Sequence, residues 1–218
     1  MQYTHERETQ QRKPVLVIPG PLPLRDEGLN GTMDAYLQSR GLDSVLAIAN
    51  GWYPSRSAGD SEPRVVIPAL SAFPGHWFWQ ARAIYGYSLT DANINVKRYQ
   101  SPYGNRLDAV VVMAPGVSCR DKALLVEGPM CALAGAGEGY LSVALLGNTP
   151  SDMVVRHVAS LLKPFAVSYI ADSDAVPQAA HLTGRLAAAG VYVILKPCRG
   201  WKDLADVPRG SRALLLEQ

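Results

Sequence analysis

The chain has 218 residues, of which 48% are hydrophobic, and 21 Lys and Arg against 19 Asp and Glu give a net charge of +2. This composition excludes an intrinsically disordered protein and supplies a core for one large domain or two small ones. No run of about 18 apolar residues and no signal-peptide core is found, so we expect a cytoplasmic protein without a membrane segment. Because the net charge is small, contact with nucleic acid must depend on local clusters of basic residues.

The three cysteines, Cys119, Cys131 and Cys198, form no CxxC pair, so by themselves they build neither a disulfide framework nor a four-ligand zinc site. We expect reduced thiols. Without a CxxH spacing or a Walker A sequence, we also expect no zinc-binding domain and no helicase fused to this chain.

The first third of the chain predicts an arm followed by a helix. Residues 1–30 are polar and then rich in Pro and Gly, which favours an extended arm. Thr32–Arg40 has helical spacing, with Met33, Tyr36 and Leu37 on one face and Gly41 as a stop.

From Ser44 to Val112 the sequence changes to short β-type runs that are broken by Pro, Gly, Ser and Asn. We therefore expect a small, β-rich N-terminal subdomain over residues 31–120. Its predicted strands are Arg64–Pro68, His76–Arg82, Val96–Gln100 and Ala109–Met113.

After Cys119, strands alternate with helices, which predicts an α/β subdomain over residues 121–218 with a mostly parallel sheet and flanking helices. Thr149 and Pro150 indicate the N-cap and first residue of one helix, and Gly190 closes another. The predicted strands are Ala123–Glu127, Leu141–Leu146, Ala166–Ala171 and Val191–Leu195.

Acidic residues follow these strands at their carboxyl ends. Glu127 ends the first, Asp172 and Asp174 follow the third, and Asp203 and Asp206 follow the fourth. Loops at this edge of an open α/β sheet converge on one crevice, so we expect a cluster of acids, which repels itself unless a cation binds it. For each acid alone, a turn, a helix cap or a solvated strand end is the alternative.

Oxygen ligands without His or Cys suit Mg²⁺ or Mn²⁺ and argue against zinc. Carboxylate-bound magnesium is the usual apparatus of phosphoryl and nucleotidyl transfer, where it neutralises charge on phosphate oxygens. The strand-end acids therefore indicate a divalent metal site that acts on a nucleotide or a nucleic acid.

Three segments resemble the Toprim signature, which combines a Glu-Gly motif, an Asp-x-Asp motif and a later acid. They are Leu125–Met130, Ala171–Ala175 and Lys202-Asp203. The Toprim fold is shared by bacterial-type primases, topoisomerases and some nucleases, so the resemblance implies a fold and not one reaction.

The upstream half is similar to the catalytic core of bacterial and phage DNA primases. Its opening, Tyr36–Leu42, resembles the YLxxRGI motif of that family. Four further matches follow in the same order, and this collinearity is more specific than any single motif. They are Arg64–Pro68 (R-x-x-x-P), Gln80–Arg82 (G-x-R), Lys97–Pro102 (K-Y-x-N-S-P) and Ala144–Thr149 (A-x-x-G-T).

The resemblance assigns roles to individual residues. It implies that Glu127, Asp172, Asp174 and Asp203 hold Mg²⁺ or Mn²⁺, and that Lys97 joins Glu127, Asp172 and Asp174 in catalysis. The basic residues that it places against the template or the nucleotide are Arg64, Arg82, Lys97, Arg98 and Lys202.

Two positions depart from the primase pattern. Cys131 stands four residues after Glu127, where primases carry an Asp, and Ala205 interrupts the late Asp-x-Asp motif. These changes leave the number of metal ions open. We expect the Cys131 thiol to be buried in a helix and to pack as a small hydrophobic group.

The resemblance implies a nucleotidyltransferase that joins NTPs on a single-stranded DNA template, in phage or mobile-element replication. A separate helicase and a separate zinc-binding module for template recognition are the partners that it implies. Two alternatives remain open: a Toprim nuclease that activates water, and a non-catalytic replisome component that binds nucleic acid through a degenerate site.

Overall fold

The computed structural model of the protein describes residues 22–58, 62–72, 77–84, 97–102, 108–116, 121–147 and 149–217. Its strands are β1 (Tyr53–Ser55), β2 (Arg64–Ser71), β3 (Trp77–Ala83), β4 (Tyr99–Gln100), β5 (Ala109–Met113), β6 (Lys122–Val126), β7 (Leu141–Ala144), β8 (Ala166–Ala171) and β9 (Val193–Pro197). Its α-helices are α1 (Asn30–Ser39), α2 (Ser44–Ala49), α3 (Pro129–Gly137), α4 (Asp152–Leu162), α5 (Val176–Ala188) and α6 (Arg209–Glu217). Two 3-10 helices, η1 (Glu27–Leu29) and η3 (Leu204–Asp206), complete the described elements.

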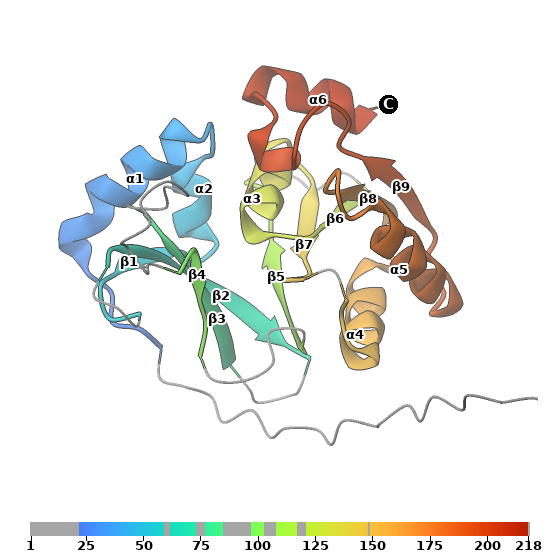
Figure 1. Ribbon diagram of the computed structural model, residues 1–218, viewed down its shortest axis with the longest axis horizontal. Coiled ribbons are helices and arrows are strands. Elements are labelled where there is room, and N and C mark those ends of the chain that lie inside the picture. The colour runs from blue at the N-terminus through green and yellow to red at the C-terminus, as the bar shows by residue number, and fades with distance from the viewer. Residues whose placement is uncertain are drawn as a thin grey trace, which may run out of the picture.

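The strands form one nine-stranded sheet in the order β4-β3-β2-β5-β7-β6-β8-β9, and β1 also pairs with β2. Figure 1 shows β1 to β4 with α1 and α2 on one side of the molecule, and the later strands with α3 to α6 on the other. The predicted α/β fold, with a mostly parallel sheet after a smaller β-rich part, is confirmed.

The N-terminal half begins with the predicted helix. In α1, Met33 and Leu37 are fully buried, and Gly41 at φ +64° allows the turn that ends the helix. Residues 22–29 of the predicted arm pack against β1, because Tyr53 Oη donates a hydrogen bond to the carbonyl of Pro23 at 2.9 Å. Residues 1–21 of that arm lie outside the described residues.

The sequence did not predict helix α2. Its N-cap is Asp43, whose carboxylate accepts a hydrogen bond from the backbone N–H of Leu46 at 2.9 Å. A helix of six residues is too short to show a periodic apolar stripe, so the β-type neighbours dominated the prediction for this stretch.

Strand β5 joins the two halves of the sheet. It pairs antiparallel with β2 through Leu70↔Val110 and with β7 through Val112↔Val143. The predicted boundary at residue 120 remains a prediction, and both the sheet and one core cluster extend across it. That cluster includes Leu37 from the N-terminal half and Leu124 from the parallel half.

The parallel part carries the strand ends on which the acids lie. Strand β6 pairs parallel with β7 and with β8, and β8 pairs parallel with β9. In register, Leu125 lies opposite Tyr169, which in turn lies opposite Leu195. The carboxyl ends of β6, β8 and β9 are therefore adjacent.

Helices cover both faces of the sheet. A cluster with Met33, Leu133 and Leu216 packs α1, α3 and α6 on one face, and a cluster with Val158 and Leu182 packs α4 and α5 on the other. Helix α6 was not predicted, and β9 begins two residues later than expected. Within the described ranges, no helix has the length and apolar character needed to cross a membrane.

The start of α4 corrects the sequence prediction. Its N-cap is Ser151, not Thr149, and the Ser151 hydroxyl accepts a hydrogen bond from the Val154 N–H at 3.4 Å. Ser151 has the extended conformation (φ −64°, ψ 162°) that an N-cap residue adopts.

We expect Ser151→Ala to lower the free energy of unfolding by about 1 kcal/mol, because the Val154 N–H loses its partner. The matched change Thr149→Ala, at an exposed position, should stay within about 0.5 kcal/mol of wild type. Urea unfolding monitored by circular dichroism measures both. A larger loss of unfolding free energy for Thr149→Ala than for Ser151→Ala would show that Thr149 is the N-cap.

Candidate functional site

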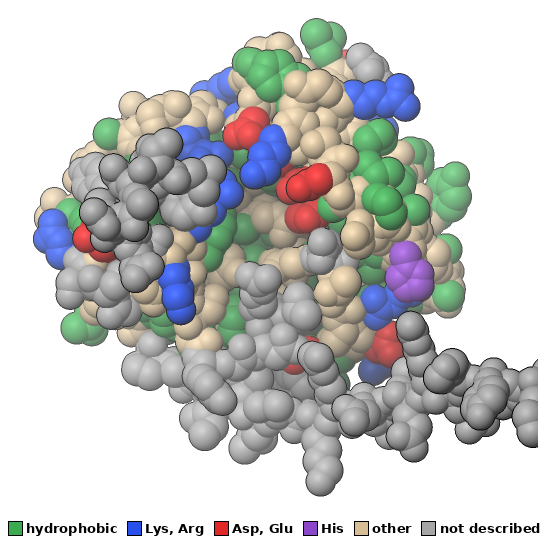
Figure 2. Space-filling view, in the orientation of Figure 1, with side chains coloured by type: hydrophobic (Ala, Val, Ile, Leu, Met, Phe, Trp, Pro, Cys, Tyr) green, Lys and Arg blue, Asp and Glu red, His purple; other side chains and the backbone are tan. Residues whose placement is uncertain are grey.

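A pocket of about 220 Å³ lies between the two halves, at the carboxyl ends of β6 and β8. Figure 2 shows basic and acidic side chains gathered around this hollow. Its lining comes from elements far apart in the chain: Arg40, Gln80, Arg82, Arg98, Tyr99, Glu127, Gly128, Pro129, Met130, Cys131, Leu146, Gly147, Asp172, Lys202 and Asp203.

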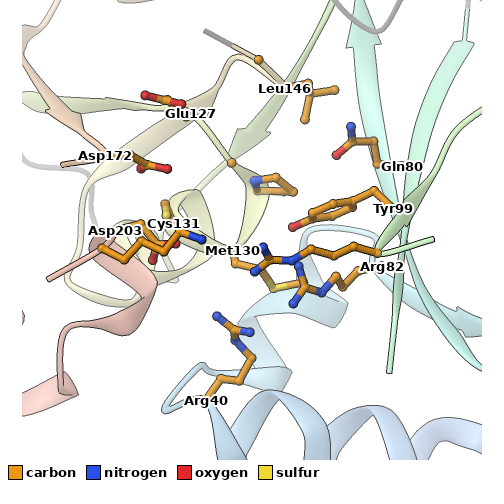
Figure 3. A pocket seen from close by; sticks show the side chains of 15 residues that line it. Arg40, Gln80, Arg82, Tyr99, Glu127, Met130, Cys131, Leu146, Asp172 and Asp203 are labelled. Carbon is orange, nitrogen blue, oxygen red and sulfur yellow. The ribbon is translucent and has the colours of Figure 1, made fainter. Parts of the chain in front are cut away.

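Three carboxylates form one side of the pocket. Glu127 and Asp172 directly follow the neighbouring strands β6 and β8, and Asp203 lies in the loop after β9, where it caps η3 by accepting the Asp206 N–H at 3.0 Å. Figure 3 shows these three side chains together, opposite the arginines. Asp174 is exposed and does not line the pocket.

Burial and repulsion by neighbouring acids make Asp172 and Glu127 resist ionisation. Desolvation, reinforced by the charges of Glu127, Asp203 and Asp174, raises the pKa of Asp172 from 3.8 to about 7, and Lys202 opposes the shift. Burial and the charge of Asp174 also raise the pKa of Glu127. Acids that repel one another in a common pocket are suited to share a cation.

Two polar atoms near the acids are buried without a hydrogen-bond partner among the described residues: Glu127 Oε1 and Tyr169 Oη. Tyr169 is fully buried, and the charges of Glu127 and Asp172 add to the burial that raises the pKa of its phenol. Tyr169 pairs with Leu125, two residues before Glu127, and its phenol is close enough to Glu127 for that charge to act on it.

Cys131 occupies the floor of the pocket as a buried thiol in α3, 4% exposed. Burial and the nearby Asp203 carboxylate raise the pKa of this thiol well above its ordinary value, so it stays protonated. The expected small hydrophobic group in a helix is therefore what the structure contains.

Basic and aromatic side chains form the opposite wall. The Nε of Arg82 in β3 donates a hydrogen bond to Tyr36 Oη at 3.0 Å, and its guanidinium lies 5.0 Å from the centre of the Tyr99 ring. Arg40 extends from the end of α1 and contacts Asp206 at 3.4 Å. These contacts fix the positions of the two guanidinium groups, which Figure 3 shows facing the acids.

Comparison with solved structures identifies the fold. The Aquifex aeolicus primase (zinc-binding and RNA polymerase domains) matches with a TM-score of 0.62 and 16% identity over 84% of this chain. The Escherichia coli primase catalytic core matches with a TM-score of 0.61 and 12% identity over 88% of this chain and 72% of its own. The RNA polymerase domain of Mycobacterium tuberculosis primase DnaG matches with a TM-score of 0.59 and 12% identity, over 86% of this chain and 76% of its own.

The chain has the fold of a bacterial primase catalytic core. It spans about half, 55%, of the Aquifex aeolicus structure. No protein-family profile and no curated protein matches the sequence. The likeness at 12–16% identity therefore establishes the fold.

The primase-core fold brings together some of the predicted basic residues and separates others. Arg82, Arg98 and Lys202 line the pocket. Lys97 is exposed and does not line it, whereas its neighbour Arg98 does. Arg64 corrects the prediction: it is fully buried and donates a hydrogen bond to the Ala81 carbonyl at 3.2 Å, so it is not available to a phosphate.

On the basic and aromatic wall, sequence reasoning missed three of the lining residues: Arg40, Gln80 and Tyr99. Each lies inside a segment that resembles a primase motif. The YLxxRG segment contains Arg40, and the other two lie in the segments around Arg82 and Lys97. The signal was therefore present, but neither charge nor spacing showed which side chains face the acids.

The carboxylate oxygens that line the pocket are the kind of ligand that a hard divalent cation prefers. The three acids that line the pocket offer only carboxylate oxygens, and Glu127 Oε1 has no protein partner among the described residues. In the described part of the chain, however, no three His, Cys, Asp or Glu side chains converge closely enough to enclose an ion. The predicted metal ligands, Asp174 included, remain a prediction.

We expect the protein in EDTA to lose stability as the pH rises from about 4 to 7. Because the pKa of Asp172 is about 7 when folded and ordinarily 3.8, the folded state binds more protons than the unfolded chain across this window. The free energy of unfolding therefore falls as the pH rises. Asp172→Asn should flatten that slope, and equal slopes for the two proteins in urea unfolding would contradict the assignment.

Proposed function

We propose that the protein is a DNA primase catalytic core that joins NTPs into short RNA primers on single-stranded DNA. One observation carries this proposal: in a chain with the primase-core fold, acids at the ends of β6 and β8 face Arg82 of β3 and Arg40, just after α1, across one pocket. Nucleotidyl transfer needs such an arrangement, because one wall binds the polyanion and the other activates it.

Two solved structures support the choice of ligands. A DnaG primase catalytic domain was solved bound to single-stranded DNA, and this chain matches it with a TM-score of 0.57 and 14% identity. The second is bacteriophage T7 lagging-strand DNA polymerase interacting with primase domains of two gp4 subunits, a complex bound to an RNA/DNA hybrid and dTTP, which matches with a TM-score of 0.57 and 14% identity. We therefore propose a DNA template and a nucleoside triphosphate as the ligands of this chain.

Glu127, Asp172 and Asp203 are the pocket residues that would hold Mg²⁺ or Mn²⁺. When bound, such an ion neutralises charge on the phosphate oxygens and lowers the pKa of an attacking hydroxyl. The exposed Asp174 would contribute from the edge of the pocket, where its charge already acts on Glu127.

The residues of the chain bind and orient the reactants. Arg82 and Arg98 bind triphosphate or template phosphate oxygens. Contacts with Tyr36 and Tyr99 hold the Arg82 guanidinium in place. The primer 3′-oxygen forms a bond to the α-phosphorus, the bond from that phosphorus to the bridging oxygen breaks, and pyrophosphate leaves. Glu127 Oε1 is the proposed acceptor of the 3′-hydroxyl proton, because burial raises the pKa of this carboxyl toward neutral pH and so makes it a stronger base.

A separate helicase and a separate zinc-binding module are the proposed partners, because unwinding and template recognition need parts beyond a catalytic core. An origin in a phage or mobile element belongs to the same proposal. The Aquifex aeolicus structure shows one such combination, in which zinc-binding and RNA polymerase domains occur together.

A priming assay tests the function. Mixed-sequence single-stranded DNA, four labelled NTPs and Mg²⁺ or Mn²⁺ should yield short labelled oligoribonucleotides with wild type and none with Glu127→Gln. Cutting of the DNA in the absence of NTPs would instead assign a nuclease. DNA binding with neither product would assign a non-catalytic protein.

We expect Arg82→Gln to weaken binding of single-stranded DNA or NTP by about tenfold and to reduce the salt slope of DNA binding by about one. The guanidinium that contacts Tyr99 would be lost, while a planar amide keeps part of the packing. Arg56→Gln is the matched control, since Arg56 is half exposed and pairs with Asp26 outside the pocket. Equal effects of both changes on fluorescence anisotropy would contradict this role.

A further inference from the structure

A second hollow lies at the opposite ends of the parallel strands from the pocket with the acids. It has a volume of about 500 Å³ and runs along β9, with Tyr192, Ile194 and Leu216 among its lining residues. We call it the β9 groove. A neighbouring hollow of about 430 Å³ shares Lys196 with it and extends to Trp201 and Leu214.

The β9 groove leaves part of a sheet face uncovered. Strand β9 ends the sheet, and Ser168↔Ile194 pair on the face that α6 covers farther along. Ile194 is 50% exposed and Tyr192, just before the strand, is 81% exposed. Parallel strands are normally covered on both faces, so an accessible Ile at this position marks a surface that lacks a covering element.

Apolar exposure is concentrated on this side of the protein. Of nine exposed large hydrophobic residues in the described part of the chain, four belong to β9 and its surroundings: Tyr192, Ile194, Trp201 and Leu214. Figure 2 shows hydrophobic side chains along the top and the right of the molecule, where Figure 1 places α6, β9 and α5. Exposed apolar side chains that line two adjoining hollows mark a candidate interaction site.

The rim of the β9 groove is basic. Lys122, Lys163 and Lys196 line it together with a single acid, Glu217, and Arg199 adds a further positive charge in the neighbouring hollow. Lys196 Nζ donates to the Leu216 carbonyl at 2.9 Å, which ties one of these charges to α6. An apolar floor inside a basic rim is complementary to a ligand with apolar and acidic side chains.

We propose that the β9 groove docks an acidic amphipathic helix of a partner protein. Its apolar face would cover Tyr192 and Ile194, and its carboxylates would face the three lysines of the rim. The five residues of β9 span about 17 Å, the length of about 11 helical residues. A second copy of this chain fits less well, because pairing two such rims would bring their lysines together.

A binding assay tests this surface independently of priming. The probe is a fluorescein-labelled 14-residue peptide with Leu on one helical face and Glu on the other, and fluorescence anisotropy reports its binding to the full chain. We expect saturable binding with a Kd of about 100 µM or tighter. A peptide with Lys in place of Glu, and one with Ser in place of Leu, should each bind at least about tenfold more weakly.

Two variants locate the contact. Ile194→Asp should weaken binding at least about tenfold, while Val45→Asp, at a 76% exposed position on α2, should leave it unchanged. Lys163→Glu should also weaken binding, because it reverses a charge on the rim without changing the apolar floor. Thermal melts verify that all three variants fold. Ile194→Asp and Val45→Asp should prime as wild type does.

Four results would overturn the proposal. The first two are no saturable binding of the Glu peptide and equal binding of the Lys peptide. The other two are equal losses of affinity for Ile194→Asp and Val45→Asp, and release of the bound peptide by a single-stranded oligonucleotide that carries the same net charge as the peptide. A concentration-dependent dimer that Ile194→Asp disrupts would assign the surface to a second copy instead. None of these outcomes depends on whether the protein synthesises primers.

Discussion

Asp172→Asn should abolish primer synthesis, by about a thousandfold or more, while it stabilises the protein in EDTA at pH 8. The reason is that a single carboxylate has two opposing effects. It is proposed to hold the cation that acts on the phosphates, yet its pKa of about 7 shows that ionisation is costly in the folded chain. The neutral amide removes the function and the repulsion together.

Priming assays and thermal melts of the same preparations measure both effects. Asp121→Asn is the matched control, because Asp121 is exposed at the opposite end of the sheet, just before β6. It should change neither activity nor melting temperature. Asp172→Asn with activity within tenfold of wild type would contradict its place at the centre of the site.

Arg212→Met should lower the free energy of unfolding by about 3–5 kcal/mol, because several buried carbonyls lose their donor at about 1–3 kcal/mol each. Arg212 is 2% exposed, and its guanidinium donates to the carbonyls of Val207 at 2.9 Å, Gly41 at 2.8 Å and Ala205 at 3.2 Å. Its removal leaves these buried acceptors without their donor, and Met restores only the volume. The same contacts attach η3, next to Asp203, to the turn after Arg40.

Urea unfolding of Arg212→Met against Arg209→Met separates burial from charge. Arg209 lies in the same helix, is 64% exposed and contacts Asp43 at 3.9 Å, so its loss should cost less than about 1 kcal/mol. Similar losses for the two variants would show that Arg212 contributes only a surface charge.

Most of the parallel half could be predicted from its pattern. There the continuous apolar run of β8 predicted its bounds to the residue, as did that of the antiparallel β5, because short buried strands between polar turns leave few alternatives. Helix α6 was missed because Gly210 and Ser211 lower its intrinsic propensity. Its position depends on the tertiary contacts of Arg212, which no local pattern shows.

The acidic side of the pocket was easier to predict than the basic side. Strand ends in a parallel sheet meet at one edge whatever the side-chain details, so Glu127 and Asp172 could be placed together from the topology alone. Lys97 and Arg98 lie just before β4, outside the strand, so no alternation pattern shows that Arg98 and not Lys97 lines the pocket. Arg64 is fully buried and donates to the Ala81 carbonyl, and this burial depends on tertiary packing that a β-type run of residues does not reveal.

Binding of Mn²⁺, followed by the electron paramagnetic resonance signal of the free ion, tests most directly whether the strand-end acids share a cation. Wild type should bind Mn²⁺ with a millimolar or tighter Kd, Glu127→Gln and Asp172→Asn should lose it, and Asp206→Asn, whose carboxylate contacts Arg40, should retain it. Failure of wild type to bind below about 10 mM, or undiminished binding by Glu127→Gln, would contradict a metal centre in this pocket.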